Sequence, residues 1–431
     1  MPDTKRERLR LAVSALTVGV AAFAAVGAGP AAAKAQHKAA AKHFAFAQTN
    51  NTDGNTVLVF KRAANGKLTK VKEVKTGGTG TAAQPPFGLP VVDTANSVTL
   101  SANRKLLFVV NSGDNTITSF KVNNGGLVKA DRKSSGGILP VSIAVHGDVV
   151  YVLNGLSGNV FGYHVAGSGK LTQIPDSAQA LSTVGPDGIA AGLGFTPDGQ
   201  WLVATERFLP REHGTDGNNG IIDRFRIHGN GSPSPVIGSE AATPTPFGFE
   251  FTPSGILVTS SAGVVNTVNG EMPPLTDGTK MNGSAQSYSI SNTGALTPIS
   301  NAPANGRATC WLVLTKDAKF AFATNTASAA AANPVPGNPI GTGKDGVSRF
   351  SVNADGTLKL IGNVDSGPGF AGDLALSPDQ KYLYVANSSL GVIGDDVSSI
   401  SVYGVGSSGD LTPVQTTPMN LPKGTSGMAV T

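Results

Sequence analysis

A short pattern of apolar and polar residues recurs seven times along the chain. Each copy is an apolar run that ends on a polar residue, and an aromatic residue and usually a Gly-x-Leu turn follow it. The polar residues that end the runs are Gln48, Asn111, Asn154, Glu206, Ser260, Asn325 and Asn387. Successive polar marks lie 43 to 65 residues apart, which is room for four short strands and their turns. The pattern therefore predicts an all-β fold, a seven-bladed β-propeller of four-stranded antiparallel blades.

A second kind of apolar run, ending in Ser or Thr before a tight turn, precedes most copies. Leu374–Ser377, followed by Pro378-Asp379, is one example. The first copy, which begins at His43, has no such run before it. The C-terminal residues Met428–Thr431 have the missing sequence. We therefore expect residues 426–431 to supply the innermost strand of blade 1, which would close the ring and leave no open edge.

The first 35 residues have the features of a secretory signal peptide. A basic head, which includes Arg8 and Arg10, precedes the uncharged apolar run Leu11–Gly27, and Ala33-Lys-Ala35 offers small residues for cleavage. We expect residues 36–42 to be disordered and residues 43–431 to form the propeller. A retained membrane anchor is the alternative, but the run is rich in Ala and Gly and barely long enough to span a bilayer. The prediction is a secreted protein with no membrane span after signal removal, and attachment to the cell wall is left open.

The composition agrees with an extracellular β-protein. The chain has 431 residues, with 55 Gly, 27 Pro and only 14% charged residues. Removal of residues 1–35 leaves 28 Lys and Arg against 26 Asp and Glu, so we expect no nucleic-acid partner. Cys310 is the single cysteine, which excludes an intrachain disulfide. No catalytic triad, phosphate loop or His/Cys metal cluster is visible, so we expect no cofactor or metal. We also expect a monomer.

Long insertions follow the second strands of blades 4 to 7. The gap from polar mark to aromatic residue is nine residues in blades 2 and 3, but 16 to 28 residues in blades 4 to 7. The insertions are residues 207–220, 261–283, 326–346 and 388–397. Because the second strand of a blade ends at the top face of the ring, these loops should surround one sector of that face. They predict a ligand pocket there, the alternative being loops without a site.

Four segments resemble the lactonase-type seven-bladed propellers, the family of bacterial phosphogluconolactonase and fungal carboxymuconate cyclase. They read GFTPDGQWLVATE, PFGFEFTPSGILV, RATCWLVLTKDAKFAFATNT and LALSPDQKYLYVAN. Endings similar to Tyr-Val-x-Asn also resemble the surface propellers with Tyr-Val-Thr-Asn repeats. The resemblance implies a hydrolase of a lactone or related cyclic ester that acts at the top face of the ring.

The resemblance also implies where catalytic residues should lie. Enzymes of the family place His and Arg at the top of inner strands, and a Glu after the Asn that ends a second strand. The equivalent inner-strand positions here are Asn96/Ser97, Val141/Ser142, Ala191/Gly192, Phe247/Gly248, Cys310/Trp311, Gly372/Asp373 and Ser426/Gly427. None of them is His or Arg. At the end of the second strand of blade 4, the family's Asn-Glu pair is replaced by Glu206-Arg207. The acid is therefore one residue out of register with the family's Glu, and strand alternation would point it to the opposite face of the blade.

Opening a lactone requires a base that activates water and a cation that holds the developing oxyanion. The catalytic candidates are Glu206 as base, with Arg207 and His213. The ligand-binding candidates are Arg307, Trp311 and Asp373. The alternatives are a solvated charged loop, a rim salt bridge, inter-blade packing and a structural hydrogen-bonding role in the channel. Two hypotheses remain: a secreted lactone hydrolase, or a non-catalytic extracellular ring that binds a glycan, small molecule or protein.

Overall fold

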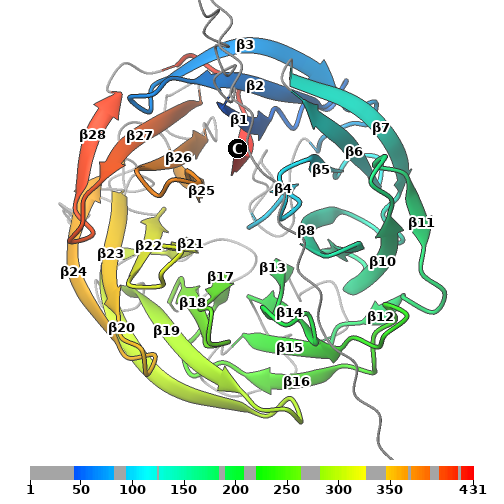
Figure 1. Cartoon of the computed structure of the whole chain (residues 1–431). Coiled ribbons are helices and arrows are strands. Elements are labelled where there is room, and N and C mark those ends of the chain that lie inside the picture. The colour runs from blue at the N-terminus through cyan, green and yellow to red at the C-terminus, as the bar shows by residue number, and fades with distance from the viewer. Residues whose placement is uncertain are drawn as a thin grey trace, which may run out of the picture. The chain divides into compact units, whose positions relative to one another are not determined.

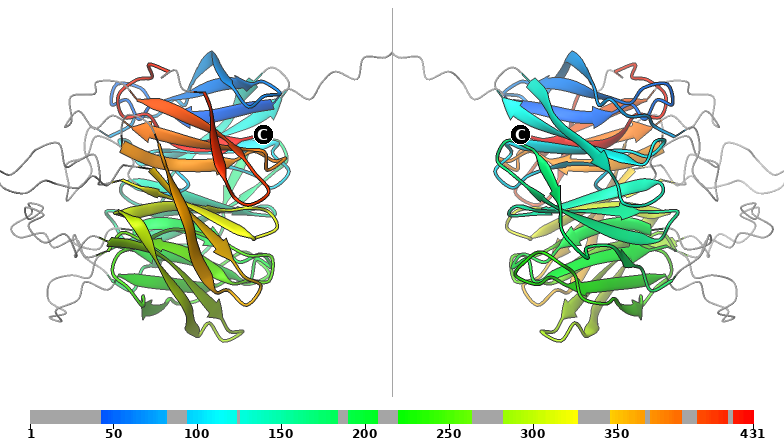
Figure 2. Two further views of the ribbon diagram at one scale, coloured as in Figure 1. Left: turned by 90° about the vertical axis from the view of Figure 1, so that its left-hand side faces the viewer. Right: turned by 90° about the vertical axis from the view of Figure 1, so that its right-hand side faces the viewer.

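A computed structural model of the chain describes ten segments, which are residues 43–81, 94–123, 126–183, 190–207, 220–263, 282–326, 346–366, 370–388, 398–415 and 419–431. They form seven sheets around a central axis (Figure 1), and Figure 2 shows the same sheets from two sides. The regular structure of these segments is β-strand, and none of their residues forms a helix long and apolar enough to cross a membrane. The predicted signal peptide, residues 36–42 and most of the four predicted top-face insertions lie outside the described residues.

The seven sheets are the blades that the repeats predict, and in each the strands run from the axis to the rim. Blade 1 contains β29 (Ser426–Val430), β1 (His43–Gln48), β2 (Thr56–Arg62) and β3 (Leu68–Lys75). Blade 2 contains β4 (Val98–Leu100), β5 (Leu106–Asn111), β6 (Thr116–Asn123) and β7 (Gly126–Ser134). Blade 3 contains β8 (Pro140–His146), β9 (Val149–Asn154), β10 (Asn159–Val165), β11 (Leu171–Gln173) and the short β12 (Gln179–Ala180), which also pairs with β10.

The remaining blades each have four antiparallel strands. Blade 4 contains β13 (Ala190–Phe195), β14 (Trp201–Glu206), β15 (Ile221–Arg226) and β16 (Ile237–Glu240). Blade 5 contains β17 (Pro246–Phe251), β18 (Leu257–Ser261), β19 (Asn282–Ile290) and β20 (Leu296–Arg307). Blade 6 contains β21 (Thr309–Leu314), β22 (Phe320–Asn325), β23 (Gly346–Val352) and β24 (Leu358–Asp365). Blade 7 contains β25 (Phe370–Leu376), β26 (Tyr382–Ser388), β27 (Ser399–Val405) and β28 (Leu411–Gln415).

The C-terminal strand closes the ring, as the sequence predicts. β29 pairs antiparallel with β1, and Val430 lies opposite Ala45. The Thr431 amide donates to the Phe44 carbonyl at 2.8 Å, and the Phe44 amide donates to Thr431 Oγ1 at 2.8 Å. The prediction of seven blades, with residues from the C-terminus completing blade 1, is therefore confirmed (Figure 1).

The repeated polar residue has a structural role that explains its place at the end of an apolar run. The second strand of a blade is covered by neighbouring blades on both faces, so all six residues of β5 are buried. The polar residue that ends it is also buried and must find partners. Asn111 Nδ2 donates to Thr118 Oγ1 at 3.0 Å, and Asn325 Nδ2 donates to Ser348 Oγ at 2.9 Å. Buried amides thus tie the second strand to hydroxyl groups on the third.

The glycine of the Gly-x-Leu turn is required by both its conformation and its neighbours. Gly294 has φ of 83°, and a Cβ there would lie 2.6 Å from the Trp201 ring of blade 4. Gly409 has φ of 77°, and a Cβ there would lie 2.6 Å from the Phe320 ring of blade 6. These two turns therefore pack under an aromatic residue of the preceding blade, which a side chain at the glycine would prevent.

Candidate functional site at the mouth of the central channel

A short segment of blade 2, Thr94–Ser97, crosses the top of the central channel; we call it the channel plug. Inner strands begin at the top face, where second strands end, and the plug lies against their first residues. Thr94 Oγ1 donates to the Val141 carbonyl of blade 3 at 2.6 Å. The Ala95 amide donates to the Ala191 carbonyl of blade 4 at 2.9 Å. The plug therefore contacts the adjacent blade 3 and also blade 4, which is not adjacent to blade 2.

The plug also contacts the opposite side of the ring. The indole Nε1 of Trp311, on β21 of blade 6, donates to the Thr94 carbonyl at 2.9 Å. Asn96 Nδ2 donates to the Leu193 carbonyl of blade 4 at 3.2 Å. Ala95 belongs to an apolar cluster with residues of blades 4 to 7. The plug thus links blades 3, 4 and 6 across the ring.

Arg207, Phe247 and Trp311 form a stack beside the plug. The Phe247 and Trp311 rings lie 4.9 Å apart between centroids, and the Arg207 guanidinium carbon lies 4.9 Å from the Phe247 centroid. Arg207 is only 3% exposed, so the aromatic face stabilises its charge in place of water. The structure therefore brings two predicted site residues, Arg207 and Trp311, to the same phenylalanine.

Asp373, on β25 of blade 7, links the plug to the strand that closes the ring. Its Oδ2 accepts from the Met428 amide of β29 at 3.2 Å, and its Oδ1 accepts from the Leu374 amide at 2.9 Å. The Asn96 backbone of the plug also donates to this carboxylate. Burial raises the pKa of Asp373 to about 7, although the three backbone donors oppose the increase. The charge of Glu250 raises this pKa further.

Glu250, on β17 of blade 5, is the second carboxyl of the channel. Its Oε2 accepts from the Leu314 amide of blade 6 at 2.7 Å. Burial raises its pKa to about 7. Glu250 and Asp373 thus have the same role, since each accepts hydrogen bonds from the inner strand of the next blade.

Glu206, at the end of β14, lies in a different environment and is buried with Asp223 of β15. Ser182 Oγ lies 2.5 Å from Asp223 Oδ1 and 3.4 Å from Glu206 Oε1. Thr183 donates to Glu206 through its hydroxyl and through its amide, the latter at 3.3 Å. Burial, followed by the charge of Asp223, raises the pKa of Glu206 to about 9. The two carboxyls therefore share one proton at neutral pH, and Glu206 holds it.

Glu206 and Arg207 point to opposite sides of blade 4, as strand alternation predicts. The carboxyl of Glu206 faces Ser182 and Thr183, which follow blade 3 along the chain, whereas Arg207 lies over Phe247 of blade 5. The described structure does not bring the two side chains together. Their roles as base and oxyanion clamp remain a prediction.

The other predicted site residues are placed less fully. His213 lies outside the described residues. Arg307 ends β20, opposite Asn282 of β19, and only its backbone is described. Among the described residues no group of three or more His, Cys, Asp and Glu is arranged to hold a metal ion.

Two features of the site were missed by the sequence reasoning. Asp223 is an acid within the otherwise apolar beginning of β15, and that unusual position is a signal of a buried partner. The channel plug has no such signal, because its bonds to Ala191 and from Ile143 are made by backbone groups.

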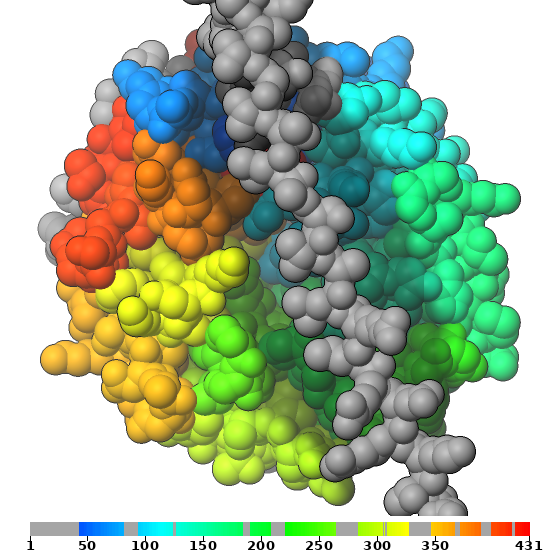
Figure 3. Space-filling view, viewed as in Figure 1, coloured from blue at the N-terminus to red at the C-terminus, as the bar shows by residue number. Residues whose placement is uncertain are grey.

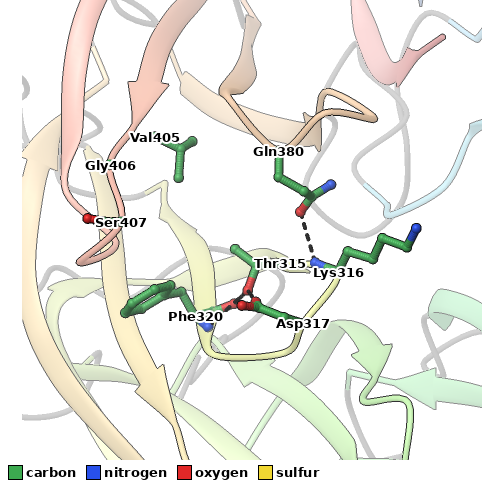
Figure 4. Close-up of a pocket in the computed structure, with 8 residues that line it drawn as sticks. All are labelled: Thr315, Lys316, Asp317, Phe320, Gln380, Val405, Gly406 and Ser407. Atoms are coloured by element: carbon green, nitrogen blue, oxygen red, sulfur yellow. Dashed lines mark hydrogen bonds between the residues drawn. The ribbon is translucent and has the colours of Figure 1, made fainter.

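A separate cavity of about 540 Å³ opens on the bottom face between blades 6 and 7 (Figure 4). It is lined by Thr315, Lys316, Asp317, Phe320, Gln380, Val405, Gly406 and Ser407. Gln380 Oε1 accepts from the Lys316 amide at 2.8 Å, which joins the two turns at its edge. Of the predicted site residues whose side chains the structure describes, none lines this cavity.

Comparison with known proteins supports the class that the fold defines. Residues 25–185 match the family model described as Lactonase, 7-bladed beta-propeller. The resemblance to lactonase-type seven-bladed propellers is therefore confirmed, with a match that spans less than half of the chain. A search of the curated proteins found no match.

Solved structures share the fold over almost the whole chain. A candidate 6-phosphogluconolactonase from Bacteroides uniformis has 19% identity and a TM-score of 0.61, covering 90% of this chain and 100% of its own. A periplasmic gluconolactonase from Pseudomonas aeruginosa has 16% identity and a TM-score of 0.61, covering 90% and 99%. A hypothetical selenium-binding protein from Sulfolobus tokodaii has 12% identity and a TM-score of 0.60, covering 91% and 94%. At these identities the similarity establishes the fold alone.

Proposed function

We propose that this protein is an exported hydrolase that opens a lactone or a related cyclic ester at the top face of the ring. The fold is that of the lactonase-type propellers, and one protein of similar structure is named a periplasmic gluconolactonase. That name is compatible with an exported lactone hydrolase. The N-terminal sequence of this chain supports the export part of the proposal, because it has the features of a signal peptide.

One observation carries the proposal. Of the seven inner-strand pairs at which the family places its cations, only the pair of blade 7 contains a carboxyl group, that of Asp373. Its pKa of about 7 matches the requirement for a general base at neutral pH, since such a group is partly ionised and still accepts a proton well.

The proposed chemistry is attack of water on the ester carbonyl. Asp373 accepts a proton from the attacking water as the new carbon–oxygen bond forms. The ring carbon–oxygen bond then breaks, the released alkoxide oxygen takes that proton back from Asp373, and the product leaves as a hydroxy acid. Arg207 is the cation of the site, and its burial against Phe247 makes its charge more effective than it would be in water.

Proton release from a panel of five- and six-membered lactones, with the purified protein at pH 7.5, tests the proposal. We expect turnover that falls at least about 100-fold in Asp373→Asn, because a general base contributes about 10² to 10⁴ in rate. Glu206→Gln should retain activity, since Glu206 already holds a proton. Loss of activity in Glu206→Gln with retention in Asp373→Asn would instead assign the base to Glu206. Absence of turnover in the unaltered protein would overturn the proposed function.

A non-catalytic ring that binds a glycan, small molecule or protein is the second candidate. It is favoured by the channel plug and by the absence of His and Arg from the inner-strand pairs. Binding of sugars that raises the melting temperature of the protein, together with no turnover of any lactone, would support this candidate.

A further inference from the structure

The charges of this protein are separated along the chain. Residues 43–135, which include β1 to β7, contain twelve Lys and Arg against five Asp and Glu. Residues 136–431 contain fourteen Lys and Arg against twenty-one Asp and Glu. The near neutrality of the chain after residue 35 therefore conceals a basic side formed by blades 1 and 2.

Six of these twelve basic residues lie on the outermost strands of the two blades, and Lys67 directly precedes one of these strands. β3 and β7 lie at the rim of the ring, in adjacent blades (Figure 1), and the two blades adjoin in the space-filling view (Figure 3). Lys129 Nζ of β7 lies 2.9 Å from the position that a Cβ on Gly77, just after β3, would occupy. We call the surface made by these cations the basic rim; its members are Lys67, Lys70, Lys72, Lys75, Lys129, Arg132 and Lys133.

Acidic residues neutralise only part of the basic rim. Glu73 pairs with Lys70 at 3.0 Å. On β7, Arg132 pairs with Asp114 and Lys133 pairs with Asp131. The other four members are exposed and form no ion pair with a carboxylate of the described segments; they are Lys67, Lys72, Lys75 and Lys129. A surplus of about four positive charges thus faces solvent on one side of the ring.

Protection of strand edges against aggregation does not explain this surplus. Lysine on an exposed edge strand does prevent pairing with another chain. However, the outermost strands of the other five blades, β11, β16, β20, β24 and β28, contain Lys359 as their single lysine. Bulges, prolines or short length protect those edges, as in β20 with Pro298 and Pro303. The outermost strands of blades 1 and 2 therefore have more cations than the outermost strand of a blade needs for protection against pairing with another chain.

We propose that the basic rim binds a linear polyanionic glycan, that is, a polysaccharide with regularly spaced carboxylate, sulfate or phosphate groups. Lys67 to Lys75 span about 26 Å at the strand rise of about 3.3 Å per residue, which is the length of several sugar units. Lysine is a point charge on a flexible stem, so it accepts anionic groups in variable orientations. The proposal is independent of the proposed function, because the rim is remote from the channel mouth.

Other polyanions fit the described surface less well. The large exposed apolar side chains on β3 and β7 are Val71 and Val128, and no exposed aromatic residue is found among the described residues of the rim. A single-stranded nucleic acid is usually held by aromatic stacking in addition to charge. The strands that contain most of these cations, β3 and β7, follow the curved outer edge of the ring (Figure 1), which suits a flexible polymer better than a flat lipid surface.

The test compares two variants that lose the same charge. In the rim variant Lys67, Lys72, Lys75 and Lys129 are replaced by Gln; in the control variant Lys170, Lys316, Lys359 and Lys381 are replaced by Gln. All eight lysines are exposed, so both variants should fold. The probes are a fluorescent heparin fragment and polygalacturonate, with neutral dextran as negative control, titrated at several salt concentrations between 50 and 200 mM.

We expect the unaltered protein and the control variant to bind both anionic glycans, with affinity that falls as salt rises. The rim variant should bind at least tenfold more weakly, and its log–log salt slope should be smaller by about 3 to 4. Equal weakening in both variants would show a general charge effect and overturn the proposal. Tighter binding to duplex DNA or to anionic phospholipid vesicles than to either glycan would overturn the choice of partner.

Discussion

Replacement of Glu206 by Gln tests the buried acid pair of blade 4. As pH rises, the unfolded chain releases the Glu206 proton near the ordinary pKa of 4.5, whereas the folded protein releases it only near the raised pKa of about 9. The folded pKa is raised, so the stabilisation is complete below pH 4.5 and is lost as pH rises toward 9. In Glu206→Gln the side-chain amide donates to Asp223 in place of the carboxyl proton, and the part of the pH dependence of stability that Glu206 causes should disappear.

The magnitude follows from the difference in protonation. Each pH unit between the two pKa values lowers the free energy of unfolding by about 1.4 kcal/mol per such group. From pH 5 to pH 8 Glu206 therefore contributes a loss of about 4 kcal/mol. Asp373 and Glu250, whose pKa values burial raises to about 7, add a smaller loss of their own. Because Asp373 and Glu250 contribute equally in both proteins, the prediction concerns the difference in free energy of unfolding between the unaltered protein and Glu206→Gln at each pH.

Urea unfolding at pH 5, 6.5 and 8 measures this difference. Relative to the unaltered protein, Glu206→Gln should gain about 4 kcal/mol of stability between pH 5 and pH 8. Glu240→Gln, which alters an exposed acid of the same blade, serves as the control and should show no such gain. A difference between protein and Glu206→Gln that stays constant over the whole pH range would refute the reasoning.

Three further changes test the ring and its plug. Trp311→Phe leaves the buried carbonyl of Thr94 without its indole donor, and urea unfolding should show a loss of about 1–3 kcal/mol. Gly427→Ala places a Cβ 2.6 Å from Val98 at φ of 71°, so it should destabilise the protein more than Gly147→Ala, where φ is 59° and the space is open. Differential scanning calorimetry gives both melting temperatures, and equal shifts would contradict the stated close approach. Deletion of residues 426–431 removes β29, so the shortened chain should lose its cooperative thermal transition and expose β1; an unchanged transition would contradict closure by this strand.

The architecture was predictable because it is repeated in the residue pattern. Second strands covered by two neighbouring blades must be apolar along their whole length, and β5 shows this as Leu106–Asn111. Closure was predictable for a related reason, since blade 1 lacked an inner strand and β29 was left without a blade. Seven copies of one pattern leave few alternative arrangements.

The site was less predictable because its decisive contacts join distant residues. Alternation placed Glu206 and Arg207 on opposite faces, but nothing in the sequence names Asp223 or Thr183 as partners of the acid. The bond from Trp311 to Thr94 joins residues 217 positions apart. Net charge likewise hides the basic rim, because the acids that balance it lie mainly in other blades. Pairing over such distances depends on how the ring brings blades together.

The pH dependence of kcat/KM for the best lactone substrate tests the proposed function most directly. If Asp373 is the base, activity should rise with pH along a single limb centred near 7, and Asp373→Glu should shift that limb while Glu206→Gln leaves it in place. A profile that is flat from pH 5 to pH 9, or a limb that moves in Glu206→Gln and not in Asp373→Glu, would contradict the assignment.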